Sequence, residues 1–409
     1  MKLKPIINSL LVEDLYKFSM GQCAQHQFNK DWTVWAFKCR NNDVHFTEEM
    51  VQEIKEQIDH FCSLRFTNDE LDWMRKNIPW LSEDYISNLR LWHPWRDEIF
   101  INDKDNQIFN ACGLTIEARG RWVDTSMFEI PVLAIVNEVY FAFKYGVGKF
   151  NKNFKRNTDE KLSKLVSGEY KIGTFSEFGL RRRYSSDMQD WLIGRLTEMR
   201  TQFSGSNFLG TSNVYLAKKY NIRPVGTMAH EIIQVMQGHR EYNPAYSNML
   251  VMKAWEKEYG VDNGIFLTDC ITTDCFLKDF NKKYATLFNG VRHDSGCPFE
   301  WGNKIISHYK KLGINPKTKT LLFSDSLDFA KADVIYNTFQ DDINVAFGIG
   351  TYLSNDLGDV NPLNIVMKVM SVNGSPVAKI SDTPGKTMCL DYEYVEYLKR
   401  CIDWRLKND

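Results

Sequence analysis

The chain has 409 residues and a formal net charge of −1, with 43% hydrophobic and 25% charged residues. Proteins that bind nucleic acid over a broad surface carry a clear excess of Lys and Arg, so this charge balance argues against a nucleic-acid partner. The length exceeds that at which one hydrophobic core usually stops growing, which predicts two domains. The composition is ordinary for a globular protein and leaves little room for long disordered tails.

The cysteines and the apolar segments indicate a cellular location. The nine cysteines are odd in number, lie scattered along the chain and form no C-x-x-C pair, so neither a disulfide framework nor a zinc site follows. Residues 1–5 lack the apolar region of a signal peptide, and the most apolar predicted helix, 130–145, is interrupted by Asn137 and Glu138. We expect a cytoplasmic protein without a membrane partner.

The first 125 residues are typical of a small α/β domain. Their hydrophobic patterns alternate between period two, which predicts strands, and helical period. We expect strands over residues 32–38, 98–102 and 114–117, and helices over 48–61 and 68–77.

From about residue 172 the chain repeats one theme: a short apolar run, a polar or glycine-containing turn, and an amphipathic helix. Apolar strands separated by helices predict a parallel sheet that is buried on both faces, either an open sheet or a closed barrel, and the pattern alone does not separate these. The predicted strands cover residues 172–178, 208–209, 222–227, 265–268, 287–292, 320–324 and 345–347.

The last part of the chain is expected to return to the first domain. Two more strands are predicted over residues 365–372 and 377–380, followed by a helix over 391–407. We therefore divide the chain into an N-terminal domain of residues 1–125, joined by 370–409, and a barrel domain of residues 126–369.

Parallel α/β sheets bind ligands beyond the carboxyl ends of their strands, so the turns after the strands are the places to search. The segment 177–183 ends in Arg181, Arg182 and Arg183, whose guanidinium groups would suit phosphate or pyrophosphate. A solvated basic helix start would have the same composition.

A histidine lies in the next such segment, Gly226-Thr227-Met228-Ala229-His230-Glu231, where a strand runs into a helix. The N-terminus of a helix offers free N–H groups to phosphate. A neutral imidazole at that point could serve as acid, base or phosphoryl acceptor. A purely structural buried histidine is the alternative.

Three further turns carry polar groups. Residues 290–296 present Arg292, Asp294 and Ser295 between two glycines, which suits a carboxylate and sugar hydroxyls, although a surface ion pair would look similar. In the segment 324–328, Asp325 or Ser326 could simply cap the following helix. Residues 347–351 have the composition of a backbone phosphate cradle. Five such turns in one chain together predict an enzyme that acts on a phosphorylated sugar.

With these segments assembled, the chain resembles the nicotinate phosphoribosyltransferases over nearly its whole length. Several long motifs in the same order are far more specific than any one of them. The matching stretches are EDLYKFSM at 13–20, FGLRRR at 178–183, GTMAHE at 226–231, GVRHDSG at 290–296, FSD at 323–325, FGIGT at 347–351 and PLNIV at 362–366.

The resemblance implies a type II phosphoribosyltransferase fold: an irregular, TIM-like α/β barrel of about seven parallel strands, with a smaller α/β N-terminal domain completed by the C-terminal tail. It implies a homodimer with shared active sites. It also implies a reaction of NAD salvage, in which nicotinate and phosphoribosyl pyrophosphate give nicotinate mononucleotide and pyrophosphate. ATP hydrolysis with Mg²⁺ would be coupled to this transfer through a phosphohistidine.

The family's roles fall on matching positions of this chain. His230 would be the phosphohistidine, and Asp294 would hold ribose hydroxyls or stabilise the oxocarbenium ion. The resemblance implies that Tyr16, from the second subunit, and Phe178 stack on the pyridine ring, and we assign the nicotinate carboxylate to Thr227 and Arg292. The expected contacts of phosphoribosyl pyrophosphate are Arg181, Ser295, Gly350 and Thr351.

One position departs from the family, because Cys297 follows Gly296 where an aspartate is common. The metal ligands therefore stay open. Two other functions share much of the pattern: nicotinamide phosphoribosyltransferase, and a barrel that binds phosphoribosyl pyrophosphate without catalysis. A barrel aldolase or decarboxylase would need a Schiff-base lysine at a strand end, for which Lys368 is the candidate.

Overall fold

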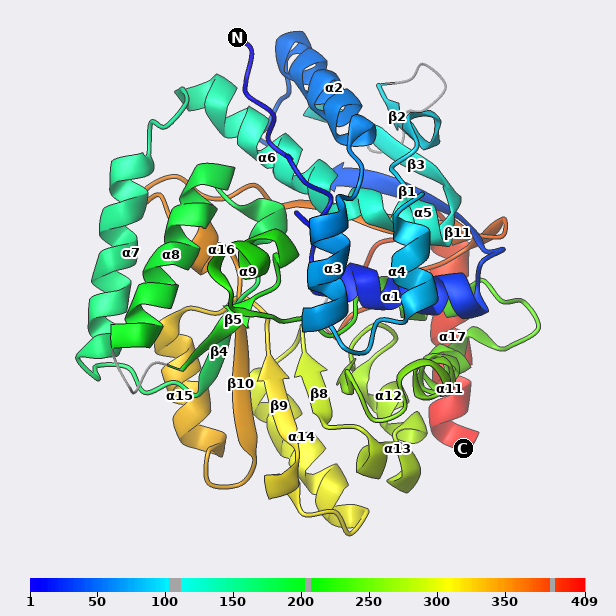
Figure 1. Ribbon diagram of the computed structural model, residues 1–409. Coiled ribbons are helices and arrows are strands. Elements are labelled where there is room, and N and C mark those ends of the chain that lie inside the picture. The colour runs from blue at the N-terminus through cyan, green and yellow to red at the C-terminus, as the bar shows by residue number, and fades with distance from the viewer. Residues whose placement is uncertain (103–111, 203–206, 383–386, 409) are drawn as a thin grey trace.

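The computed structural model describes residues 1–102, 112–202, 207–382 and 387–408, which form two β-sheets with helices around them (Figure 1). One sheet has seven strands and the other has five. The chain builds most of the five-stranded sheet first, then the seven-stranded sheet, and finally returns to complete the first.

The seven-stranded sheet is parallel throughout, with the order β6-β5-β4-β10-β9-β8-β7. Its edge strands, β6 and β7, do not pair with each other among the described residues, so the sheet is a curled, incomplete barrel. The predicted fold class is confirmed. The strands are β4 (Thr174–Glu177), β5 (Phe208–Thr211), β6 (Arg223–Pro224), β7 (Ile265–Leu267), β8 (Gly290–His293), β9 (Thr320–Phe323) and β10 (Asn344–Ile349).

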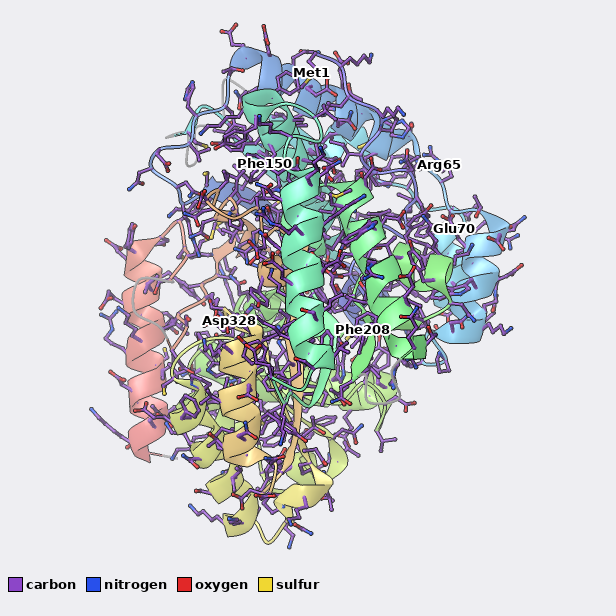
Figure 2. All side chains as sticks on the ribbon, turned by 90° about the vertical axis from the view of Figure 1, so that its left-hand side faces the viewer. Met1, Arg65, Glu70, Phe150, Phe208 and Asp328 are labelled. Carbon is purple, nitrogen blue, oxygen red and sulfur yellow. The ribbon has the colours of Figure 1, made fainter. Side chains whose placement is uncertain are left out.

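Helices follow the strands, as the alternating pattern predicts. Figure 2 shows two of them, α7 and α8, side by side on the face turned to the viewer, with Phe150 next to the start of α7. Phe154 and Trp191 pack between them, with ring centroids 6.2 Å apart. The helices of this part are α7 (Asn151–Val166), α8 (Ser186–Gln202), α9 (Val214–Tyr220), α10 (His230–Gln237), α11 (Ser247–Tyr259), α12 (Thr273–Asp279), α13 (Lys282–Leu287), α14 (Pro298–Lys311), α15 (Phe329–Phe339) and α16 (Thr351–Ser354).

Two local predictions for this sheet are wrong. Leu287 was expected to begin a strand but is the last residue of α13, and β8 begins only at Gly290. The cap of α15 is not Asp325 or Ser326: the side chain of Asp328 accepts a hydrogen bond from the backbone N–H of Lys331 (2.7 Å). The turn 324–327 is thereby left to face the cavity described below.

The second sheet has the order β12-β11-β1-β3-β2 and joins the two ends of the chain. β11 (Ile365–Val372) pairs antiparallel with β1 (Trp32–Cys39), and β1 pairs antiparallel with β3 (Ile116–Arg121) (Figure 1). The edges are β2 (Ile99–Ile101) and β12 (Ser375–Pro376). The strand predicted over residues 377–380 is wrong, because only Lys379 makes a bridge there, with Met388.

The remaining helices lie in the N-terminal part, except for the last one. Thr67 and Glu70 form a capping box at the start of α3, which explains its boundary. These helices are α1 (Leu15–Gln27), α2 (Glu48–Ser63), α3 (Asn68–Asn77), α4 (Glu83–Leu89), α5 (Trp122–Thr125), α6 (Glu129–Tyr145) and α17 (Tyr392–Asn408).

The most apolar helical stretch, Trp122–Tyr145, includes α6 and has the length and composition of a membrane span. In the folded chain, 89% of its apolar window is buried inside the protein. It is therefore a buried core helix that packs against α2 and β11, and it begins with the buried carboxylate of Glu129. No other described helix is long and apolar enough to span a membrane.

Candidate active site

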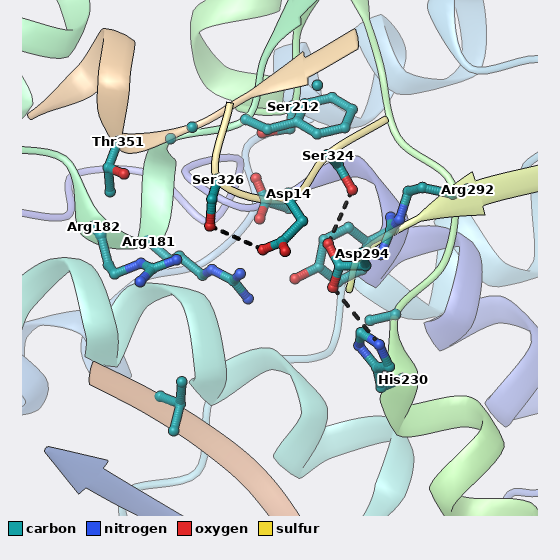
Figure 3. A pocket seen from close by; sticks show the side chains of 18 of the residues that line it. Asp14, Arg181, Arg182, Ser212, His230, Arg292, Asp294, Ser324, Ser326 and Thr351 are labelled. Atoms are coloured by element: carbon teal, nitrogen blue, oxygen red, sulfur yellow. Dashed lines mark hydrogen bonds and ion pairs between the residues drawn. The ribbon is translucent and has the colours of Figure 1, made fainter. Parts of the chain in front are cut away.

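A cavity of about 470 Å³ lies at the carboxyl ends of the seven-stranded sheet (Figure 3). The turns after β4, β5, β6, β8, β9 and β10 form one wall, and α1, β11 and the end of β1 form the other. The site therefore lies between the two sheets, and one chain supplies both walls.

His230 is the first residue of α10, and its imidazole borders the cavity. Its Nε2 atom lies 2.9 Å from Asp269 Oδ1 and 3.7 Å from Asp294 Oδ2. Burial and the nearby ammonium of Lys379 lower the pKa of His230 to about 4, against the opposing effect of the two aspartates. The imidazole is consequently neutral at physiological pH.

Asp269 lies two residues after β7 and is almost completely buried. Its Oδ2 atom accepts a hydrogen bond from Ser295 Oγ (2.5 Å) and forms an ion pair with Lys379 Nζ (3.2 Å). Burial opposes ionisation, but the histidine and the lysine hold the pKa of Asp269 well below its usual range. Because an ionised carboxylate only accepts hydrogen bonds, the proton of His230 lies on Nε2 and the lone pair on Nδ1.

Arg292 and Asp294 come from the end of β8 and point into the cavity (Figure 3). Arg292 Nη1 donates a hydrogen bond to Thr227 Oγ1 (2.7 Å), and Ser324 Oγ donates to Asp294 Oδ1 (2.9 Å). Burial opposes ionisation of Asp294, but Arg292, His230 and Lys379 keep its pKa below its usual value. The site thus contains a fixed guanidinium fork and a fixed carboxylate.

Tyr16 and Phe178 supply aromatic faces to the same cavity. A glycine makes room for each. A Cβ atom at Gly348 would lie 2.2 Å from the Phe178 ring, and one at Gly226 would lie 3.0 Å from the backbone N of Tyr16. The two glycines therefore leave space for the Phe178 ring and for the backbone that carries Tyr16.

Six cationic side chains and three carboxylates line the cavity, which leaves it with an excess of positive charge. Arg182 keeps its proton at neutral pH, although burial lowers its pKa to about 10. Such a wall suits a ligand with several phosphate groups. The cations are Arg40, Arg181, Arg182, Arg292, Lys368 and Lys379, and the carboxylates are Asp14, Asp294 and Asp325.

The structure gathers nine of the ten predicted site residues around this one cavity. They are Tyr16, Phe178, Arg181, Thr227, His230, Arg292, Asp294, Gly350 and Thr351.

Ser295 is the tenth, and its predicted direct contact with the substrate needs correction. Its side chain lies behind the cavity, is 1% exposed and donates to Asp269. Tyr16 lines the cavity of its own chain, and its expected contribution to the site of a second subunit stays a prediction.

Sequence reasoning did not assign roles to several residues of the site. Asp269 follows a predicted strand and could have been found by the same search of strand ends. Arg40 and Lys379 carry no local signal, because they reach the cavity only through the pairing of β1 with β11 and the chain that follows it. Arg183, in contrast, is buried away from the cavity, where it donates to the carbonyl of Ile6 and to Gln189.

His230, Asp269 and Asp294 place three ligand atoms within 4.8 Å of one another, a spacing that could hold a metal ion. The hydrogen bonds argue against a resident Mg²⁺. Both oxygens of Asp269 already have partners in His230, Ser295 and Lys379, and Mg²⁺ prefers a shell of oxygen ligands that includes several waters. Cys297 is exposed at the cap of α14 and adds no oxygen ligand.

The parallel sheet, the cationic cavity at its carboxyl ends and the buried histidine–aspartate pair define an α/β enzyme that acts on a phosphorylated small molecule. Comparison with known proteins makes the assignment specific. Residues 173–404 match the model of the nicotinate phosphoribosyltransferase (NAPRTase) family, and residues 11–137 match its N-terminal domain. The chain belongs to this family.

Individual relatives agree over the whole length. The chain is 43% identical to a nicotinate phosphoribosyltransferase of Ralstonia nicotianae, covering 97% of this chain and 98% of the relative. It is 40% identical to one of Acinetobacter baumannii, with 97% of each chain covered. Among solved structures, the nicotinate phosphoribosyltransferase of Vibrio cholerae is similar with a TM-score of 0.88 at 34% identity, covering 97% of this chain and 94% of that one. The enzyme from Porphyromonas gingivalis gives a TM-score of 0.86 at 33% identity, covering 97% and 100%.

Proposed function

We propose that this chain transfers the phosphoribosyl group of phosphoribosyl pyrophosphate to nicotinate and couples the transfer to ATP through phosphorylation of His230. The observation that carries the proposal is the neutral His230 held by Asp269 at the edge of a cationic cavity. The family membership supports nicotinate as the acceptor and pyridine nucleotide synthesis as the role.

Phosphorylation uses the free lone pair of His230. Nδ1 attacks the γ-phosphorus of ATP, the bond to the β-phosphate oxygen breaks, and ADP leaves. Throughout this step Asp269 accepts a hydrogen bond from the Nε2–H group of His230, and its negative charge stabilises the positive charge that develops on the ring. The phosphoryl group adds negative charge beside the ammonium of Lys379, and water later releases it as phosphate. Coupling requires that this charge change the affinities for substrates and products by different factors.

In the transfer of the sugar, cations of the cavity stabilise the leaving group and a carboxylate stabilises the ribose. The pyridine nitrogen of nicotinate attacks the anomeric carbon while the bond from that carbon to the pyrophosphate oxygen breaks. Arg40, Arg181 and Lys368 neutralise the leaving pyrophosphate. Asp294, which stays ionised beside Arg292, stabilises the positive charge on the ribose or holds its hydroxyls. Gly350 and Thr351 provide a backbone cradle for the 5-phosphate.

Arg292 and Thr227 select the acid over the amide. The guanidinium already donates to the threonine hydroxyl, and its remaining N–H groups can hold a carboxylate. Nicotinamide offers only a neutral carbonyl and an amino group, which form weaker hydrogen bonds with a buried guanidinium than a carboxylate does. Tyr16 and Phe178 pack on the ring faces.

In this scheme Mg²⁺ would bind together with the phosphates of ATP and phosphoribosyl pyrophosphate and would have no protein site of its own. A homodimer in the cytoplasm is part of the proposal, on the basis of the resemblance alone.

The decisive test of the transfer is turnover by the purified protein with nicotinate and nicotinamide in competition. We expect release of pyrophosphate, formation of nicotinate mononucleotide and a strong preference for the acid. Preferential use of nicotinamide would make the chain a nicotinamide phosphoribosyltransferase. Binding of phosphoribosyl pyrophosphate without release of pyrophosphate would make it a non-catalytic barrel.

A further inference from the structure

A buried cluster of charges extends from the wall of the cavity, and the reaction steps above do not use the carboxylate at its centre. Its centre is Glu129, the first residue of α6, whose side chain is only 1% exposed. One carboxylate oxygen lies 2.8 Å from Lys17 Nζ, and the other accepts a hydrogen bond from Lys368 Nζ (2.9 Å). Arg181 Nη1 lies 3.9 Å from that second oxygen.

The two sides of this carboxylate differ in their surroundings. Lys17 is fully buried and is also ion-paired with Glu231, so it has a second anionic partner. Lys368 and Arg181 instead line the cavity, and their side chains are 12% and 34% exposed. Glu129 is the carboxylate in contact with Lys368 among the described residues.

We propose that Glu129 is a positioning residue that keeps Lys368 charged and, together with Arg181, directed at the leaving pyrophosphate. This inference rests on the proposed function, in which these two cations take part in the pyrophosphate-binding wall. Glu129 itself lies behind them and touches no substrate.

The physical reason is that Lys368 stands among other cations in a buried place. Burial lowers the pKa of Lys368. The positive charges of Arg181 and Lys17 lower this pKa further, whereas the carboxylate of Glu129 raises it. Without the carboxylate, the lysine would lose its proton at a lower pH and would also lose the acceptor that fixes its position. Burial opposes the ionisation of Glu129 in turn, but Lys17, Lys368 and Arg181 hold its pKa well below its usual range.

The test is the pH dependence of inorganic pyrophosphate binding to the full-length protein, measured by calorimetry for wild type and Glu129→Gln. Both proteins meet the same ionisation of free pyrophosphate, so the difference between them reports the site. We expect binding to weaken at alkaline pH in both, with the midpoint about 1 to 3 pH units lower in the variant. In Glu129→Gln/Lys368→Arg the lowered midpoint should vanish, because a guanidinium does not titrate below about pH 12.

Glu231→Gln is the matched control, because it also removes a buried carboxylate from Lys17 but does not touch Lys368. Its alkaline midpoint should stay at the wild-type value; an equal shift there would reduce Glu129 to a general stabilising role and overturn the proposal. An unchanged midpoint in Glu129→Gln would also overturn it. Should that variant not fold, Glu129→Asp keeps the buried charge but draws the carboxylate back from Lys368, and an unchanged midpoint there has the same consequence.

Lys368→Gln separates this inference from the proposed function. If it leaves pyrophosphate affinity at neutral pH unchanged, the cationic wall itself has been assigned wrongly. If it weakens binding while Glu129→Gln does not move the midpoint, the wall stands and only the role of Glu129 falls.

Discussion

Replacing Asp269 by asparagine tests how the structure activates His230. The substitution keeps the size of the side chain but removes the charge that accepts hydrogen bonds from His230 and Ser295 and pairs with Lys379. An amide can also present its NH₂ group to the histidine, which would favour the wrong tautomer. We therefore expect the phosphorylation of His230 to slow down.

The magnitude follows from the number and kind of contacts. A hydrogen bond to a charged group contributes about 1.5–3 kcal/mol. Loss of one such bond in the transition state, at 1.36 kcal/mol per factor of ten, slows phosphorylation by about 10- to 150-fold. The pKa of His230 is not the cause, since the neutral form already predominates at pH 7 in the wild type.

Rapid-quench measurement of phosphohistidine formation from labelled ATP gives this rate directly, without the later steps. Asp294→Asn is the matched comparison, because Asp294 lies 3.7 Å from the imidazole, beyond hydrogen-bond distance. It should slow sugar transfer far more than phosphorylation. A rate for Asp269→Asn within about threefold of wild type, or less than about 0.7 kcal/mol, would refute the reasoning.

Three further outcomes are expected. Gly348→Ala places a methyl group against the Phe178 ring, so the nicotinate KM should rise while ATP-dependent phosphorylation stays near wild type; steady-state kinetics with both substrates checks this. Arg292→Lys removes the guanidinium fork, so kcat/KM for nicotinate should fall about tenfold or more and the preference over nicotinamide should shrink; equal losses for both acceptors would contradict the assignment. The rate of His230 phosphorylation should hold as pH falls and be halved near pH 4, because burial lowers the pKa of His230 to about 4 and only the neutral ring attacks; an inflection near the ordinary value of 6.5 would refute it.

Much of the fold could be predicted because each strand of the parallel sheet is a short apolar run next to a polar turn. The same pattern misplaced the start of β8, where Leu287 belongs to the preceding helix. Hydrophobic character alone does not distinguish the last turn of a helix from the first residues of a strand. The run 377–380 failed for a related reason: Val377 and Ala378 are buried, but among the described residues Val377 makes a single backbone hydrogen bond to Met370 and Ala378 pairs with the side chain of Gln237 instead of a strand.

The residues of the site divide into those that the sequence could predict and those that needed the structure. Residues at strand ends, such as His230, Arg292 and Asp294, could be predicted because parallel strands bring their carboxyl ends together. Lys368 lies on β11, Arg40 directly follows β1, and Lys379 lies in the chain after β12. The pairing of β1 with β11 brings these segments to the same cavity. That long-range pairing has no local sequence signal, so the cationic wall and the Glu129 network behind it required the structure.

The central claim is that His230 receives a phosphoryl group from ATP. Incubation of the protein with γ-labelled ATP, followed by acid and alkali treatment, tests it most directly. We expect an acid-labile, alkali-stable phosphoprotein in the wild type and no label in a folded His230→Ala variant. Label that survives in His230→Ala, or a wild type that turns over nicotinate with ATP but never becomes labelled, would contradict it.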